Sequence, residues 1–176
     1  RYGPFHNRPQ PQVAGTSLNV EIYPERREAE IRGSYQLVNK VGVNIDAVHV
    51  AAAAGLETGA ITFDRPTTAQ VLDEDFGFRV YALERPLLPE ESVRLDFVVR
   101  FNPRGFRNSG IDDSVVGNGT YFTNLKWLPA IGYPADRELS GDAERRAEGL
   151  PVRRPFPSPY DADGSWRAVD AQRVTV

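Results

Sequence analysis

One nine-residue segment with alternating side chains constrains the fold of this chain more than any other feature. Its two alternating sets are Val93, Leu95, Phe97, Val99, Phe101 and Arg94, Asp96, Val98, Arg100. A period of two places successive side chains on opposite faces of a β-strand. The segment is therefore predicted to be a strand with one face in the core and the other in solvent.

Similar alternation recurs through the first hundred residues. The predicted strands are residues 18–23, 28–37, 45–52, 59–63, 69–72 and 76–83, and the first two form an antiparallel hairpin. Polar turns separate them, and the chain holds 15 Gly and 14 Pro residues, which favours turns. The spacing predicts an all-β fold, an antiparallel β-sandwich. Gly33, in the middle of the second strand, indicates a bulge or a close backbone approach.

The length of 176 residues predicts about one domain. We expect an extended lead-in over residues 1–15 and a single sandwich domain over residues 16–176. The chain begins with Arg1 and contains no Met, which indicates a piece of a longer reading frame. Alternation over residues 168–176 predicts a strand at the end of the sequence, so we expect the natural domain to be truncated there.

The pattern changes after the last clear strand. Residues 103–141 are rich in Gly, Asn, Asp and aromatic residues, which is typical of a long irregular loop that is packed or functional. One short helix is predicted from Asp142 to Glu148, with Asp142 as its N-cap and Gly149 beyond its end. Residues 151–160 are predicted to be extended and polyproline-like.

Composition and motifs exclude several classes of function. The net charge of −3 argues against a nucleic-acid partner, and no apolar run is long enough for a membrane span. Cys is absent, and His6 and His49 do not match a metal-ligand spacing. We expect a structural His49 with satisfied hydrogen bonds, and neither a catalytic nor a metal site in this chain. A calcium site at Asp73 and Asp75 stays an alternative.

Aromatic side chains gather in the irregular region at Tyr121, Phe122, Trp127 and Tyr133. Two interpretations are open. The rings could pin the loop to the sandwich, or they could form a recognition surface for a peptide, a sugar or a neighbouring domain. The triplet 118–120 also has the form of an N-glycosylation acceptor.

Several short motifs carry a family resemblance. They lie at residues 20–24, 31–35, 88–97, 118–122 and 128–133. Together they resemble the N-terminal β-domain of the aminopeptidase N family of zinc metallopeptidases (gluzincins). The bacterial branch whose peptidase-like part is fused to an ABC-type permease is the most similar, and the resemblance covers most of residues 18–150.

The resemblance implies a saddle-like β-sandwich that lines the substrate cleft and packs on a thermolysin-like catalytic domain. The zinc ligands of the family, in HExxH with a downstream Glu, belong to that following domain and are absent here. Zinc is thus expected in the parent protein and no cofactor in this chain. The family holds the substrate's free amine with a Glu or Gln about nine residues before a Pro-containing loop. Counting back from Pro129 reaches Thr120, which is a departure from that pattern.

The sequence therefore predicts a non-catalytic N-terminal domain of a membrane-associated, aminopeptidase-like protein. It would form one wall of a peptide-binding cleft, in an extracytoplasmic part of a bacterial membrane protein. Its partners would be its own catalytic domain and a peptide. Peptide contacts are assigned to Asn118, Thr120, Tyr121 and Phe122, and packing or interdomain contacts to Trp127 and Tyr133.

Two other functions are weighed against this one. The first is a free-standing extracytoplasmic module that binds a carbohydrate or a protein, because sandwiches support many functions and aromatic platforms suit sugars. An HExxH motif downstream in the full reading frame would favour the peptidase domain over the module. An independent hydrolase ranks last, because the sequence offers no nucleophile or metal constellation.

Overall fold

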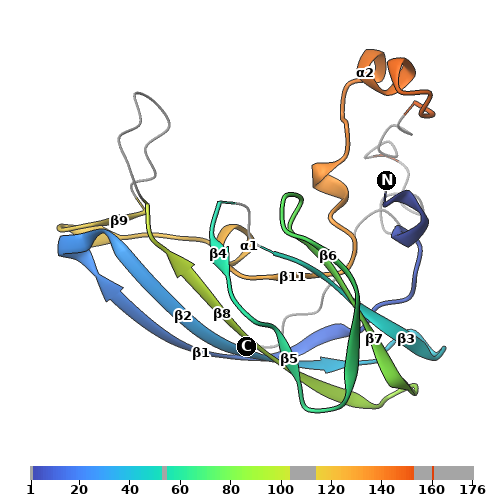
Figure 1. Ribbon diagram of the computed structural model, residues 1–176, viewed down its shortest axis with the longest axis horizontal. Helices are drawn as coiled ribbons and strands as arrows, with labels where there is room; N and C mark the ends of the chain where they lie inside the picture. The colour runs from blue at the N-terminus through green and yellow to red at the C-terminus, as the bar shows by residue number, and fades with distance from the viewer. Residues whose placement is uncertain (1, 53–54, 104–113, 153–159, 161–176) are drawn as a thin grey trace. The chain divides into compact units, whose positions relative to one another are not determined.

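The computed structural model describes residues 2–52, 55–103, 114–152 and 160 (Figure 1). The chain divides into two compact units, residues 1–135 and 136–176. Of the helices in the described ranges, none combines the length and the apolar character that a bilayer crossing requires. The division into a lead-in and one domain over residues 16–176 stays a prediction.

The first unit holds two antiparallel sheets. In one sheet the strand order is β1 (Gln12–Tyr23), β2 (Glu28–Val38), β8 (Ser92–Phe101), β4 (Glu57–Thr58), and β5 (Thr62–Phe63) also pairs with β8. In the other, the order is β11 (Ala130–Ile131), β3 (Ile45–Ala51), β7 (Phe78–Leu87), β6 (Thr67–Asp73). The short strands β9 (Val115–Val116) and β10 (Gly119–Thr120) form a separate hairpin. The predicted all-β antiparallel sandwich is confirmed.

Short helical segments connect and flank these strands. They are the 3₁₀ turns η1 (Gly3–Phe5), η2 (Pro24–Arg26), η3 (Ala135–Arg137) and the helices α1 (Asn124–Trp127), α2 (Asp142–Ala147). The sequence predicted only the last of them. α1 escaped prediction because a single turn of helix carries no periodic signal.

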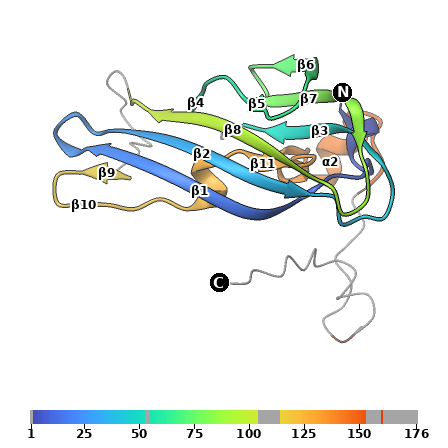
Figure 2. The ribbon, with the colours of Figure 1, turned by 90° about the horizontal axis from the view of Figure 1, so that it is seen from below.

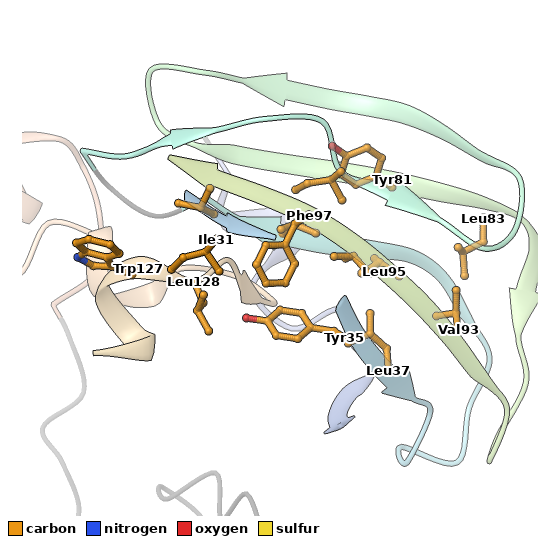
Figure 3. Packing of buried hydrophobic residues seen from close by; sticks show 14 of the residues in the cluster. Ile31, Tyr35, Leu37, Tyr81, Leu83, Val93, Leu95, Phe97, Trp127 and Leu128 are labelled. Carbon is orange, nitrogen blue, oxygen red and sulfur yellow. The ribbon is translucent and has the colours of Figure 1, made fainter. Parts of the chain in front are cut away.

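The core lies between the two sheets, and the predicted alternation places the right side chains in it. The inward residues of β2 and β8 are buried; they are Ala29, Ile31, Tyr35, Leu37, Val93, Leu95, Phe97, Val99, Phe101. Figure 3 shows Tyr81 and Leu83 of the second sheet facing this row. The rings of Phe63 and Tyr81 meet across the sheets with centroids 5.3 Å apart. Burial of these apolar side chains is the main force that holds the sandwich together.

At Gly33 the structure shows a closely packed aromatic ring in place of the predicted bulge or close backbone approach. The ladder is regular through Gly33, which pairs with Leu18 on one side and Phe97 on the other. A Cβ at Gly33 would lie 2.3 Å from Cζ of Phe97, so the ring occupies the space of the missing side chain. The irregularity of this sheet lies elsewhere, between Val13 and Gly15 of β1.

The N-terminal residues pack against the second sheet, a contact that the sequence analysis did not predict. β1 begins at Gln12, earlier than the expected residue 18. Before it, the rings of Tyr2 and Phe5 lie against Phe78 of β7, at centroid distances of 5.1 and 5.8 Å. These aromatic contacts cover Phe78 on the outer face of the second sheet, in the part of β7 (residues 78–81) that is buried on both faces.

His49 of β3 is buried under this N-terminal segment. It is 2% exposed, and the Phe5 ring meets it edge-on at 5.2 Å. Its backbone N–H donates to the side chain of Gln10 at 2.7 Å, but its Nδ1 has no hydrogen-bond partner. The prediction that the hydrogen bonds of His49 are satisfied is therefore wrong for the Nδ1 atom of its ring. Burial, with a smaller contribution from Arg8, lowers the pKa of His49 to about 4.

We expect His49 to make folding stability depend on pH. Its folded-state pKa lies below the ordinary value of about 6.5, so the unfolded chain takes up a proton first as the pH falls. The stabilisation is complete above pH 6.5 and is lost between about pH 6.5 and 4. The titration of His49 should therefore lower the free energy of unfolding by about 2 kcal/mol between pH 7.5 and 5. Urea unfolding of the wild type and of His49→Phe at both pH values measures the difference. Equal pH dependence of the two proteins would contradict this account.

The second unit contains α2, whose bounds agree closely with those of the predicted helix. Gly141, not Asp142, is the N-cap residue, so Asp142 lies in the first turn. At the other end Gly149 has a positive φ of 67°, as predicted. The N–H groups of Gly149 and Leu150 donate to the carbonyls of Arg146 and Arg145, which is the Schellman arrangement. The predicted strand over 168–176 lies outside the described residues, as do residues 153–159 of the predicted polyproline segment.

Candidate binding surface

Three packed aromatic rings hold the irregular segment on the inward face of the first sheet. Trp127 is 1% exposed and lies between Phe101 of β8, at 4.8 Å, and Phe122, at 4.4 Å. The Phe122 and Trp127 planes are only 12° apart. The Tyr35 hydroxyl also donates to the Pro129 carbonyl at 3.0 Å. Residues 114–131 are thus fixed to the sandwich by core packing, in agreement with the packing interpretation of these rings.

The residues assigned to peptide contact lie at and after the β9–β10 hairpin. Asn118 is exposed in the turn, and Thr120 is half-buried at the end of β10. The Tyr121 side chain is 78% exposed, while its N–H donates to the Ser114 carbonyl at 2.8 Å. Phe122 turns inward to the stack. A rigid backbone therefore presents the ring of Tyr121 to solvent.

Tyr133 does not belong to this surface. Its ring lies 5.3 Å from that of His6 and 6.1 Å from that of Phe78. It thus joins Tyr2, Phe5 and Phe78 in what we call the N-terminal aromatic cluster. Trp127, which was assigned together with it, is part of the main core instead. The structure thus separates two residues that the sequence placed in one stretch.

An exposed apolar row on β1 completes the candidate surface, and sequence reasoning missed it. Leu18, Val20 and Ile22 pair in register with inward-facing residues of β2, so they point to the core side. They are nevertheless 39%, 37% and 39% exposed, whereas Ile31, the partner of Val20, is 1% exposed. Figure 2 shows the reason, because β1 lies at the edge of the sheet, beside β2 and away from β8. The alternation of these residues signals a strand, but it does not reveal an edge position.

Within the described ranges, no strand pairs with the outer side of the β1 backbone. Among the described residues, β1 pairs with β2 alone. The hairpin strand β9 contacts η2, the turn that follows β1, so the hairpin lies close to one end of this edge. We use the name "β1 surface" for Leu18, Val20, Ile22 and Tyr121 together with this backbone edge.

The opposite, outward face of the sheet carries a row of charges. Arg100 Nε lies 2.7 Å from Glu30 and its Nη1 3.7 Å from Glu57. Arg32 holds Glu30 from a second side at 2.6 Å. Hydrogen bonds from Arg100 and Arg32 lower the pKa of Glu30. At the end of the row, the Glu21 carboxylate accepts the Tyr23 hydroxyl at 2.7 Å and raises the pKa of Tyr23.

The β1 surface offers apolar contact and backbone hydrogen bonds rather than acid–base or metal chemistry. In the parts of the chain that the structure describes, no group of three or more Asp, Glu or His residues could hold a metal ion. Asp73, weighed as a calcium ligand, accepts the Tyr2 hydroxyl and, at 2.9 Å, the Phe76 N–H. The donor set of the described residues therefore does not fit zinc.

Comparisons with known proteins give partial likenesses of fold. No protein-family model and no curated protein matches the sequence. An M1 zinc metallopeptidase from Deinococcus radiodurans is 15% identical over 57% of this chain and 22% of its own, with a TM-score of 0.43. A two-domain M1 zinc metallopeptidase mutant bound to L-tryptophan is 15% identical over 54% of this chain and 21% of its own, with a TM-score of 0.42.

A third structure is a mutant M1 zinc metallopeptidase from Deinococcus radiodurans bound to a Tyr-Ser-Ala substrate. It is 18% identical over 56% of this chain and 22% of its own, with a TM-score of 0.39. The chain matches about a fifth of the length of each of these three structures.

Proposed function

We propose that this chain is the non-catalytic N-terminal β-sandwich domain of an aminopeptidase-like zinc metallopeptidase. In this proposal the β1 surface is one wall of a peptide-binding cleft, and the catalytic domain of the parent docks to close the cleft. The observation that carries the proposal is the exposed inward row of β1, one end of which lies close to the β9–β10 hairpin that precedes Tyr121. The motif resemblance over residues 18–150 and the sandwich itself support it.

The core side of a sheet is normally covered by other parts of the protein. Full burial of a Leu, Val or Ile side chain contributes about 1.5–3 kcal/mol. With 37–39% of each side chain exposed, about a third of that contribution is still available at Leu18, Val20 and Ile22. A partner that covers the row gains this free energy at three adjacent positions, which favours a binding surface over a solvent face.

Zinc would be held by the catalytic domain of the parent, where it would polarise the scissile carbonyl. This chain has two His residues, of which His49 is enclosed by aromatic rings, and the residues that the structure describes form no ligand set for the metal. The contribution of this chain would be contact with the peptide. Tyr121 would pack on the peptide, and Asn118 and Thr120 would offer neutral hydrogen bonds. A neutral hydroxyl at Thr120 pairs more weakly with an ammonium group than a carboxylate does.

The location proposed for this domain is extracytoplasmic, in a bacterial membrane protein whose permease part resembles the ABC type. This part of the proposal depends on the motif resemblance alone. The reading frame that contains the chain tests it directly. Hydrophobic spans and an HExxH motif downstream would support it, and their absence would contradict it.

We expect Val20→Asp in the intact parent to impair peptide hydrolysis through substrate binding. The new carboxylate would be buried without a partner in the cleft wall, which is costly. KM should rise at least about fivefold (roughly 1 kcal/mol), with a smaller change in kcat. Steady-state kinetics on peptide substrates measure both constants. Asn19→Asp adds the same charge on the outward face of the same strand and is the matched control. Equal effects of the two substitutions would contradict the proposed wall.

The exposure of Tyr121 also favours a second candidate, a free-standing module that binds a carbohydrate or a protein. An aromatic ring that is 78% exposed on a rigid backbone is a suitable platform for a sugar face. The reading frame separates the two candidates. Without a zinc motif downstream, binding to a glycan panel that is lost in Tyr121→Ala would favour the module.

A further inference from the structure

We propose that the edge of β1 binds an extended peptide as an added β-strand, and that this peptide carries a Lys or Arg opposite Glu21. The inference deepens the proposed function, on which it rests, because it names the class of peptide that the cleft wall would select.

The edge of β1 lacks most of the features that prevent strand addition. Natural edge strands are commonly short or carry Lys, Pro, inward-pointing charges or bulges. β1 is 12 residues long, has no Lys or Pro, and points its one charged residue, Glu21, outward. Its only irregularity lies between Val13 and Gly15. From Thr16 to Tyr23 the pairing with β2 is continuous, which leaves eight residues of regular edge backbone.

The inward row sets the side-chain pattern of the peptide. Alternate residues of an added strand would lie on the same face as Leu18, Val20 and Ile22 and cover their exposed parts. Those positions should therefore be apolar, and the residues between them polar. The boundaries of the strand set the length. The regular part runs from Thr16 to Tyr23 and Pro24 ends it, so a peptide of about eight or nine residues fills the regular edge.

The charges on the outward face set the polar specificity. The cross-strand register aligns Glu57, Arg100, Glu30 and Glu21 in one row from β4 to β1. The acid–base alternation breaks at the last step, because Glu21 lies opposite another glutamate, and like charges in directly opposite positions are unfavourable. Arg100 and Arg32 satisfy Glu30. Among the described residues, Glu21 accepts the Tyr23 hydroxyl and interacts with Arg32 at longer range, but no ion pair within 4 Å includes it. A cation on the added strand would give it a direct partner.

The same row argues against a second copy of this chain as the occupant. From Gln12 to Tyr23 the strand contains no Lys or Arg. A second β1 added along this edge has no cation to place opposite Glu21, whatever its register. Charge complementarity therefore favours a separate, basic peptide strand.

Fluorescence anisotropy with defined peptides tests the inference on the full 176-residue chain. The probe is fluorescein-labelled Ser-Val-Thr-Val-Arg-Val-Thr-Val-Ser, and the matched probe has Glu in place of Arg. The Arg peptide should bind about two- to fivefold more tightly than the Glu peptide. Methylation of alternate backbone amides on the edge-facing side should weaken binding at least about tenfold, because it removes the strand hydrogen bonds.

Two variants make the charge argument specific. Glu21→Lys should reverse the preference between the two peptides. Glu57→Lys makes the same change at the far end of the row and should leave the preference as it is. The inference is overturned if Glu21→Lys still binds the Arg peptide more tightly than the Glu peptide. It is also overturned if the methylated peptide binds as tightly as the unmethylated one. Dimerisation of the chain that competes with the peptide would also overturn it and assign the edge to a second copy.

Failure of this inference and failure of the proposed function are distinguishable. If the peptides do not bind but the parent contains the zinc motif and responds to Val20→Asp, the strand pairing alone is overturned. If the peptides bind as expected but the reading frame has no zinc motif, the strand pairing stands and the peptidase assignment is wrong.

Discussion

Replacing Trp127 with Ala should lower the free energy of unfolding by about 3–5 kcal/mol. Trp127 is 1% exposed and is packed between Phe101 and Phe122. Truncation leaves a cavity under the segment that carries Tyr121, and the facing rings lose their contacts. The loss should therefore affect both global stability and the position of the exposed ring.

Denaturant unfolding measures the stability change, and Tyr121→Ala is the matched control. Tyr121 is 78% exposed, so its truncation should change the free energy of unfolding by no more than about 0.5 kcal/mol. A loss of less than about 1 kcal/mol in Trp127→Ala would show that the aromatic stack does not anchor this segment. The candidate surface would then lack a rigid base.

Gly33→Val should destabilise the sandwich by about 3 kcal/mol. A Cβ at Gly33 lies 2.3 Å from Phe97 and 2.8 Å from Leu18, closer than atoms can approach. The Phe97 ring is buried against Tyr35, with centroids 4.8 Å apart, so it cannot move aside without disturbing the core. The strain should therefore appear as lost stability.

A control and a compensating substitution sharpen this test. Gly15→Val introduces a side chain where the nearest atom is 3.6 Å from the new Cβ, so its cost should be under about 1 kcal/mol. Combining Gly33→Val with Phe97→Ala should cost less than the sum of the single changes, because the clash is removed. Additive effects in urea unfolding would contradict the packing of Phe97 over Gly33.

The regular strands were predictable because alternation and turn chemistry are local. The predicted strand over residues 93–101 corresponds to β8, observed as Ser92–Phe101, and the one over 28–37 to β2, observed as Glu28–Val38. In these strands one face is buried by the opposite sheet, so the sequence pattern and the packing agree.

The start of β1 was not predictable, because residues 12–17 lack alternation and include the irregularity between Val13 and Gly15. The N-terminal aromatic cluster was missed for a different reason. Tyr2 and Phe5 meet Phe78 through tertiary contacts across more than seventy positions of sequence. No local pattern in a proline-rich segment signals such packing.

The candidate site was predictable only in part. The aromatic density at residues 121–133 directed attention to Tyr121, but local sequence does not show that Trp127 is buried in one cluster and Tyr133 lies in another. The exposure of the β1 row was not predictable, because the edge position depends on the strand order of the whole sheet. The charge row through Glu21 likewise depends on register across four strands.

Amide hydrogen exchange tests the central claim most directly. The comparison is between the isolated 176-residue chain and the intact longer protein that the proposed function implies. The account predicts slower exchange for the edge amides of residues 12–23 and for residues 118–122 in the intact protein, because the docked catalytic domain covers the cleft. Buried strands such as β8 should exchange equally in both. Identical exchange along β1 in the two proteins would contradict the assignment of this surface as a cleft wall.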